Sequence, residues 1–169
     1  MNRNIWMLWL GLILFAPGCI GTTSRYGTEW SNLSFDKMMD EYGSPNRIEG
    51  KRVVWEKKGP WKRIAVWDGM DNYGSFVGTD NIEQTIAYSV PQNKRDAVSD
   101  FHEQVAISAD GSELSARSSS EERNFLALNL ADEIIRGVRT PDEARSFYVL
   151  TLRLADAGKT SVYMKGLRF

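Results

Sequence analysis

Cysteine and histidine are almost absent from this chain of 169 residues, which holds one of each. A single cysteine excludes a disulfide framework within the chain and any zinc site that needs several thiolates. A single histidine excludes metal sites that need two imidazole ligands. Motifs for a nucleophilic serine, a phosphate-binding glycine loop or a zinc protease are also missing. The sequence therefore predicts no metal, no cofactor and no enzymatic activity.

A large excess of charge of either sign is missing as well. The 21 basic and 22 acidic residues give a net charge of −1, which argues against a protein that binds nucleic acid through its overall charge. The composition, with 42% hydrophobic and 25% charged residues, excludes collagen, coiled-coil and wholly disordered chains. The length allows one ordinary domain.

No apolar run is long enough to cross a bilayer as a helix. The longest, residues 5–15, follows the lone charge of Arg3 and has the length of a signal-peptide core. The next four residues, Ala-Pro-Gly-Cys at 16–19, resemble the lipobox of bacterial lipoproteins, in which a cysteine behind small residues is acylated and becomes the N-terminus. Ala16 and Gly18 also fit ordinary secretory cleavage, and a buried apolar helix with a chance cysteine is a third interpretation.

The lipobox interpretation divides the chain into a signal peptide at 1–18, a lipidated tether at 19–33 rich in Gly, Thr and Ser, and a single domain at 34–169. Acyl chains on Cys19, palmitate among them, anchor such a protein in a membrane. Under the sorting rule familiar from enteric bacteria, Ile20 directs a lipoprotein to the outer membrane. We therefore expect a lipid-anchored protein of the bacterial cell envelope, in the outer membrane and facing the periplasm.

Periodicity predicts an α+β domain with a mainly antiparallel sheet of five or six strands. One hairpin is expected at 53–68 around Gly59-Pro60, and a further strand at 82–90. A second hairpin, from 101 to about 118, has Asp110-Gly111 at its centre, which is typical of a type I′ turn. Residues 161–169 are expected to form a closing strand.

Three helices are expected to accompany the sheet. A short N-terminal helix begins at Ser34, a second runs from a capping box at Ser119 to about Gly137, and a third follows a capping box at Thr140. The two later helices are expected to lie on one face of the sheet. The second helix has one polar side, and its apolar remainder is wide enough to lie across the sheet; the polar residues are Glu122, Asn129, Asp132, Glu133 and Arg136. The third packs on the sheet through Ala144, Phe147, Tyr148, Thr151, Leu154 and Ala155.

The first hairpin carries the most unusual local composition. Residues 51–63 contain six cations against Glu56, which gives +5 in a nearly neutral protein. Tryptophans beside cations suit sugar rings, lipid headgroups and anionic polymers. The alternative is that the tryptophans belong to the core and the lysines form the solvated side of the hairpin. The candidate ligand-binding residues are Trp55, Lys57, Lys58, Trp61, Lys62, Arg63 and Trp67, with Trp61 expected to be only partly buried beside the turn.

Two other features suggest chemistry less specifically. His102 is the only histidine base and is expected on the solvent side of a strand. Acidic side chains gather in the loop at 68–81 without the spacing of an EF-hand, so turn formation explains them more simply than calcium does. Two converging carboxylates would be needed for sugar hydrolysis, and the sequence singles out no pair.

A helix followed by Gly43-Ser44-Pro45, and then a strand opened by Val53-Val54-Trp55, resembles the SmpA/OmlA (BamE-like) small envelope lipoproteins. Members of that family are non-enzymatic and join outer-membrane assembly or wall-contacting complexes. The resemblance covers residues 34–70 and implies a role in an envelope complex. The two later helices have no counterpart in that family, and the resemblance assigns no residue except the lipidation site Cys19.

Three functional hypotheses follow. The first is a non-catalytic envelope lipoprotein that acts as a structural or protein-interaction module, with an envelope protein or a cell-wall component as its partner. The second is a binding module for an anionic glycan or lipid through the basic hairpin. The third is a hydrolase with two carboxylates. An exposed apolar patch favours the first, an exposed row of tryptophans the second, and a pocket with two close carboxylates the third.

Overall fold

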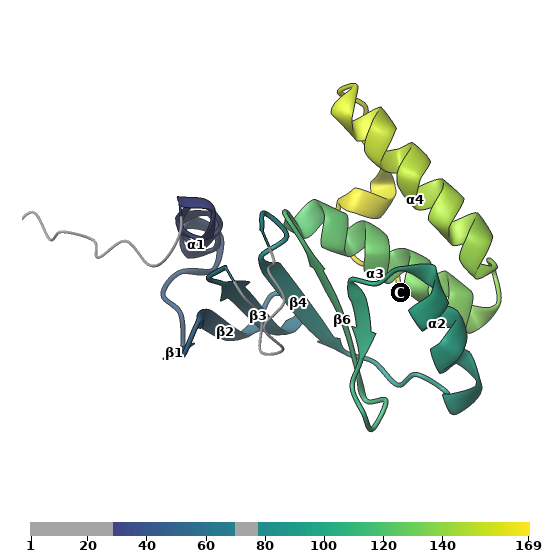
Figure 1. Cartoon of the computed structure of the whole chain (residues 1–169), viewed down its shortest axis with the longest axis horizontal. Helices are drawn as coiled ribbons and strands as arrows, with labels where there is room; N and C mark the ends of the chain where they lie inside the picture. The colour runs from purple at the N-terminus through teal and green to yellow at the C-terminus, as the bar shows by residue number, and fades with distance from the viewer. Residues whose placement is uncertain (1–28, 70–77) are drawn as a thin grey trace, which may run out of the picture.

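The computed structural model describes residues 29–69 and 78–169 (Figure 1). The predicted signal peptide, Cys19 and most of the predicted tether lie outside the described residues, as do Asp71 and Asn72 of the acidic loop. None of the helices in the described part of the chain is long and apolar enough to cross a membrane.

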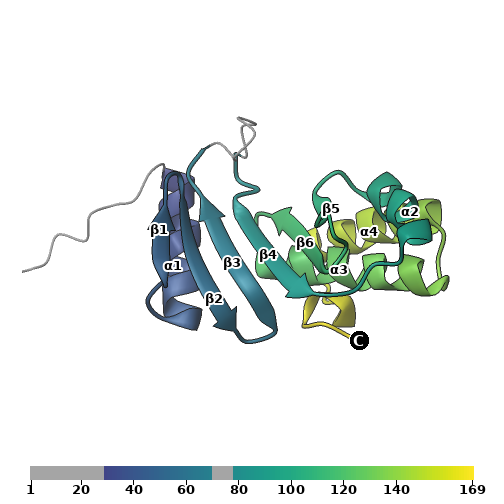
Figure 2. The ribbon, with the colours of Figure 1, turned by 90° about the horizontal axis from the view of Figure 1, so that it is seen from below.

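The described chain forms a six-stranded antiparallel sheet, which Figure 2 shows with its strands side by side. Its order is β1-β2-β3-β4-β6-β5, and consecutive hairpins join β1, β2 and β3. The predicted α+β class is thereby confirmed. The strands are β1 (Arg47–Glu49), β2 (Arg52–Lys58), β3 (Trp61–Trp67), β4 (Ile82–Ala87), β5 (Val105–Ile107) and β6 (Glu113–Ser118).

Two helices cover one face of the sheet, and the third long helix packs behind one of these two. In Figure 1, α1 (Glu29–Tyr42) and α3 (Glu121–Arg136) lie on the same side of the sheet, and α4 (Pro141–Asp156) lies beyond α3. Phe35 of α1 contacts Trp55, with 5.8 Å between ring centroids, and Phe125 of α3 stacks on Trp61 at 5.0 Å. The sheet is therefore covered by α1 and α3, whereas α4 packs on α3 and on α2 (Arg95–Phe101).

Helix α1 begins at Glu29, five residues before the expected start at Ser34. Ser34 lies inside the helix, where its Oγ donates to Asn81 Oδ1 at 2.7 Å. The prediction of a tether at 29–33 is therefore wrong. Ser31 Oγ donates to Asp68 Oδ1 at the end of β3, and Tyr42 lies against the turn at Gly59. The N-terminal end of α1 is consequently at the opposite end of the sheet from the turn of the β2–β3 hairpin.

The β5–β6 hairpin differs from the prediction in its first strand and in its turn. Residues 95–101 form α2, which follows the 3-10 helix η1 (Gln92–Lys94) and buries Val98 and Phe101. The alternation that predicted a strand from 101 is therefore misleading before residue 105. A type I′ turn needs a positive φ at Asp110, and Lys57 is the only non-glycine residue with positive φ in the described chain. The Asp110 carboxylate instead accepts from Ser108 and Ser112, which closes a longer loop.

Part of the polar side of α3 is buried: Asn129, Asp132 and Glu133 are enclosed, whereas Glu122 and Arg136 stay exposed. The expected strand at 161–169 is an irregular segment with one 3-10 helix, η2 (Val162–Met164), and it covers this side of α3. Asn129 is 2% exposed. Its Nδ2 donates to the carbonyls of Tyr163 and Gly166, each at 2.9 Å, and its Oδ1 accepts from the Arg168 amide at 2.9 Å. Tyr163 also donates to Glu133, at 2.6 Å. Helix α3 starts after Ser120, one residue later than predicted.

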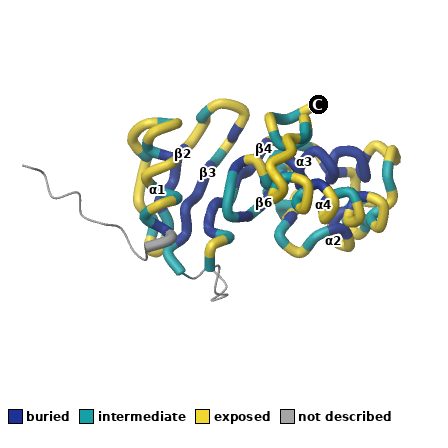
Figure 3. The backbone as a smooth tube through the Cα atoms, turned by 90° about the horizontal axis from the view of Figure 1, so that it is seen from above, coloured by how far each residue is buried: buried dark blue, intermediate teal, exposed yellow. Residues whose placement is uncertain are grey.

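Helix α4 begins with the predicted capping box at Thr140 and has Pro141 in its first turn. It buries only part of its apolar face, and Figure 3 shows it far more exposed than α3. Leu154 is 47% exposed and Leu150 is 55% exposed. The prediction that Leu154 packs on the sheet is therefore wrong, because α4 packs on α3 and α2 and buries only Ala144, Tyr148 and Thr151.

Candidate functional site

The three tryptophans of the β2–β3 hairpin do not form a binding surface. Trp55, Trp61 and Trp67 are 0%, 1% and 3% exposed. Their indole N–H groups are also occupied: Trp55 donates to the Gly43 carbonyl at 2.7 Å, and Trp67 to Glu83 at 3.0 Å. The expectations that Trp61 is partly exposed and that these rings could stack on a sugar are therefore wrong. Both faces of this hairpin are covered, so each ring belongs to one of two apolar clusters.

A buried cluster around Glu121 is the main feature that the sequence did not reveal. Glu121 is 5% exposed and lies in the first turn of α3. One of its carboxylate oxygens accepts from Trp61 Nε1 at 2.5 Å, from Tyr42 Oη at 2.5 Å and from Gln84 Nε2 at 2.8 Å. Asn124 extends the cluster by donating to Gln84 Oε1 at 2.8 Å. The only signal in the sequence is Gln84, a polar residue on the inward phase of β4.

The Glu121 cluster is structural in its chemistry. Burial and the bond to Glu121 raise the pKa of Tyr42, so the phenol stays protonated and donating. The cluster holds three donors on one carboxylate and connects α1, β3, β4 and α3. A carboxylate this enclosed has no room beside it for a substrate, so it serves to fix α1 and α3 on the sheet.

Glu41 borders this cluster and gives it a pH dependence. Burial raises the pKa of Glu41, and the nearby Glu121 carboxylate raises it further. A carboxyl whose pKa is raised by folding stabilises the fold at acidic pH, and this stabilisation is lost as pH rises through the folded pKa. We therefore predict that Glu41→Gln is more stable than the wild-type protein at about pH 7 and that the difference shrinks toward about pH 3. Urea unfolding at both pH values measures this. The control is Asp40→Asn, which changes a neighbouring carboxylate outside the Glu121 cluster and should lack the effect.

Two carboxylates from outside the hairpin neutralise part of its positive charge. Glu113 of β6 lies 2.5 Å from Lys62 Nζ and 3.3 Å from Arg63 Nη2. Arg52 pairs with Glu49 at 2.8 Å and lies over the Trp67 ring. No salt bridge or hydrogen bond to another described side chain involves the ammonium groups of Lys57 and Lys58. The cationic character that remains is therefore concentrated at the turn of the hairpin.

The face of the sheet opposite α1 and α3 carries a polar groove. Arg63 and Trp67 line it, together with Glu83, Glu113 and Arg117. Glu113 pairs with Ala87 of β4. Because Ala87 lies four residues after Glu83, the backbones of the two glutamates are separated by about 13 Å along the strands. Glu83 bonds to Trp67 and Glu113 to Lys62. This pair therefore lacks the close, free arrangement that glycoside hydrolysis requires.

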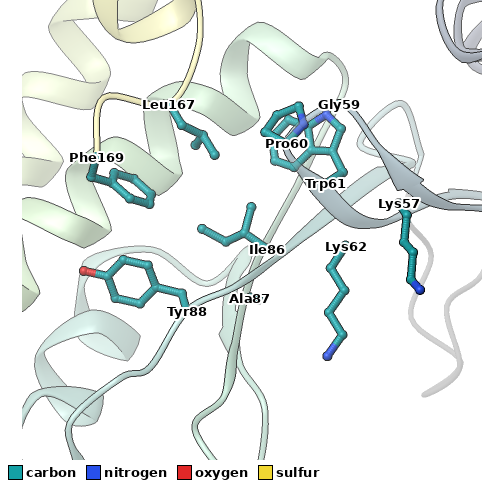
Figure 4. Close-up of a pocket in the computed structure, with 10 residues that line it drawn as sticks. All are labelled: Lys57, Gly59, Pro60, Trp61, Lys62, Ile86, Ala87, Tyr88, Leu167 and Phe169. Carbon is teal, nitrogen blue, oxygen red and sulfur yellow. The ribbon is translucent and has the colours of Figure 1, made fainter.

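A second groove lies at the turn of the hairpin and is shown in Figure 4. One side is cationic and carries Lys57 and Lys62. The other side is apolar and is built by Ile86 of β4 and by Leu167 and Phe169 of the C-terminal segment. We call this the turn groove. It brings together the hairpin, β4 and the end of the described chain, which are far apart in sequence.

His102 and the acidic loop make structural contacts. His102 follows α2 rather than lying on a strand; its Nδ1 accepts from the Gln104 amide at 3.2 Å, and its ring lies edge-on to Tyr148. Burial lowers the pKa of His102, which keeps the imidazole neutral. Asp80 accepts from Gln104 Nε2 at 2.8 Å. Within residues 29–69 and 78–169, no three His, Cys, Asp or Glu side chains are grouped so as to hold a metal ion.

Comparison with known proteins finds no significant similarity to any family model, curated protein or solved structure. The resemblance of residues 34–70 to the SmpA/OmlA lipoproteins therefore stays a prediction.

Proposed function

We propose that this protein is a non-catalytic bacterial envelope lipoprotein that acts as a structural or protein-interaction module. The observation that supports it is the α4 strip, which we define as Phe147, Leu150 and Leu154. These residues lie at i, i+3 and i+7 and so share one side of the helix. Leu150 and Leu154 are about half exposed. The strip continues the apolar face of α4 beyond the part that α3 covers.

Phe147 contacts Tyr163 inside the domain, whereas Leu150 and Leu154 extend the strip onto the surface. An exposed apolar helix face of this kind favours a protein partner. The other candidate surfaces give less support to the alternatives. The tryptophans that would stack on a glycan are buried, and the two glutamates of the sheet groove are separated and paired. Leu150 and Leu154 of the α4 strip lie outside these structural contacts and stay exposed.

The test compares envelope proteins retained by the wild-type protein with those retained by the double variant Leu150→Asp, Leu154→Asp. We expect the double variant to lose specific partners and to keep its fold. Substitutions at half-exposed positions change the free energy of unfolding by no more than about 1 kcal/mol each. Leu33→Asp is the matched control, because Leu33 is an equally exposed leucine on α1. Equal retention by all three proteins would reject the α4 strip as an interaction surface.

The envelope location rests on Cys19 and is tested separately. Cys19→Ser is expected to remove the lipid and to move the protein from the membrane fraction to the soluble fraction. Mass spectrometry of the wild-type N-terminus measures the lipid directly. A wild-type protein without acyl chains would contradict the lipoprotein proposal and leave the test of the α4 strip unaffected.

A further inference from the structure

We propose that the turn groove binds an anionic amphiphile, a carboxylate or phosphate headgroup joined to an alkyl chain. The headgroup would lie against Lys57 and Lys62, and the chain along Ile86, Leu167 and Phe169. This site is distinct from the α4 strip and does not depend on it. It replaces the row of tryptophans expected from the sequence with a different set of residues.

The cationic side of the groove contains a lysine in an unfavourable backbone conformation. Lys57 has φ of +52° and is the only non-glycine residue with positive φ in residues 29–69 and 78–169. A side chain in the left-handed region costs free energy that glycine would not incur. No hydrogen bond or ion pair of the Lys57 ammonium to another described residue offsets this cost. Residues held in such conformations cluster at ligand sites. Binding of an anionic ligand would therefore explain why a lysine, and not a glycine, occupies this position.

On the cationic side, an ion pair fixes the position of the Lys62 ammonium. Its ammonium lies 2.5 Å from Glu113 Oε1, and Figure 4 shows the Lys57 and Lys62 side chains on the same side of the groove. Lys62 is thus held in place by an ion pair, whereas Lys57 keeps its full charge available. Because the Lys62 ammonium is already paired with Glu113, Lys57 supplies the ammonium group that is free to meet a headgroup.

The apolar side is positioned by bonds behind it. Tyr88 Oη donates to Asp132 at 2.7 Å, and burial together with this bond raises the pKa of Tyr88 to about 12. The fixed Tyr88 ring meets Phe169 edge-on, with 5.3 Å between centroids. Phe169 is nevertheless 46% exposed, and Ile86 forms the floor beneath. The groove therefore presents an ordered apolar wall that remains open to an alkyl chain.

The two sides together select the ligand class. A small anion would leave the apolar wall in water, and a neutral alkyl chain would leave Lys57 without a partner. A molecule with an anionic head and an apolar chain satisfies both sides at once. Fatty acids and monoalkyl phosphates both have this chemistry, and they differ in carrying a carboxylate or a phosphate.

The experiment titrates the full chain with laurate and with monolauryl phosphate, both below their micelle concentrations, by calorimetry and NMR. Binding of either ligand, with acetate and dodecyl maltoside failing to bind, is the expected result. The tighter of the two ligands identifies the headgroup source as carboxylate or phosphate. Equal binding of dodecyl maltoside would overturn the proposal, because it would show that the charge plays no part.

The decisive variant is Lys57→Gly. It should raise the melting temperature, because glycine accepts a positive φ, and weaken ligand binding about tenfold, as expected for one lost charge-assisted hydrogen bond. Phe169→Ser should also weaken binding while the fold is kept. Lys159→Gln, an exposed lysine beyond α4, is the control and should change neither quantity. Unchanged binding by Lys57→Gly, or a lower melting temperature in that variant, would overturn the proposal.

Discussion

Replacing Trp61 with alanine is expected to destabilise the domain by about 3–5 kcal/mol, the range for removing a large aromatic side chain from a core. The ring is 1% exposed and stacks on Phe125 of α3. Its indole N–H also supplies one of the three donors to Glu121. The variant therefore loses apolar contacts and a bond to a buried carboxylate together. Such a loss is a large part of the total stability of an ordinary domain.

Urea unfolding of Trp61→Ala and Trp61→Phe separates the two contributions. Trp61→Phe keeps an aromatic ring against Phe125 and loses the donor, so it should fall between the wild-type protein and Trp61→Ala. Lys58→Ala is the control from the same hairpin and should stay within about 0.5 kcal/mol of the wild-type protein. A loss below about 1 kcal/mol for Trp61→Ala would contradict the buried stacking described above.

Glu121→Ala is expected to cost about 3 kcal/mol or more, because it leaves several buried donors without an acceptor. Trp61, Tyr42 and Gln84 all donate to this carboxylate. Each unsatisfied buried group costs about 1–3 kcal/mol, although neighbouring losses do not add fully. Glu121→Gln keeps one carbonyl oxygen as an acceptor and should retain part of the stability.

The neighbouring Glu122 provides the matched control. It is exposed and forms a surface pair with Lys37, 3.3 Å away, and surface pairs contribute about 1 kcal/mol or less. Glu122→Ala should therefore change the free energy of unfolding far less than Glu121→Ala. If the two substitutions have equal effects in thermal and urea unfolding, the Glu121 cluster does not hold the helices on the sheet.

Elements with strong local signals were predictable from the sequence. The β2–β3 hairpin has period-two alternation around Gly59-Pro60, and α4 has a complete capping box at Thr140. Both signals are made by residues close together in the chain. Helix α2 was missed because Phe101 also begins an alternating run, and a short helix packed by Val98 and Phe101 carries only one turn of periodicity.

The candidate site depended on contacts that the local sequence does not encode. Glu113 pairs with both Lys62 and Arg63 from about fifty residues away. The net charge counted along the hairpin therefore overstated the charge that is free to bind a ligand. Alternation along β3 could not predict the burial of Trp67, because alternation assumes one solvent-exposed face. In β3 both faces are buried, as Ala65 and Val66 on opposite sides show. The turn groove needs Phe169 beside Tyr88, a contact that no spacing rule predicts.

The C-terminal segment that covers Asn129 is synthesised after α3, and this affects the order of folding during synthesis. The groups that satisfy Asn129 are made 34 to 39 residues after it. A chain emerging from a ribosome therefore exposes α3 with an unpaired amide until the segment from Tyr163 to Arg168 has followed. Since an unsatisfied buried amide is costly, this side of α3 stays open to water during that interval. A nascent chain stopped before residue 160 should accordingly exchange the α3 amide protons faster than the full chain of 169 residues.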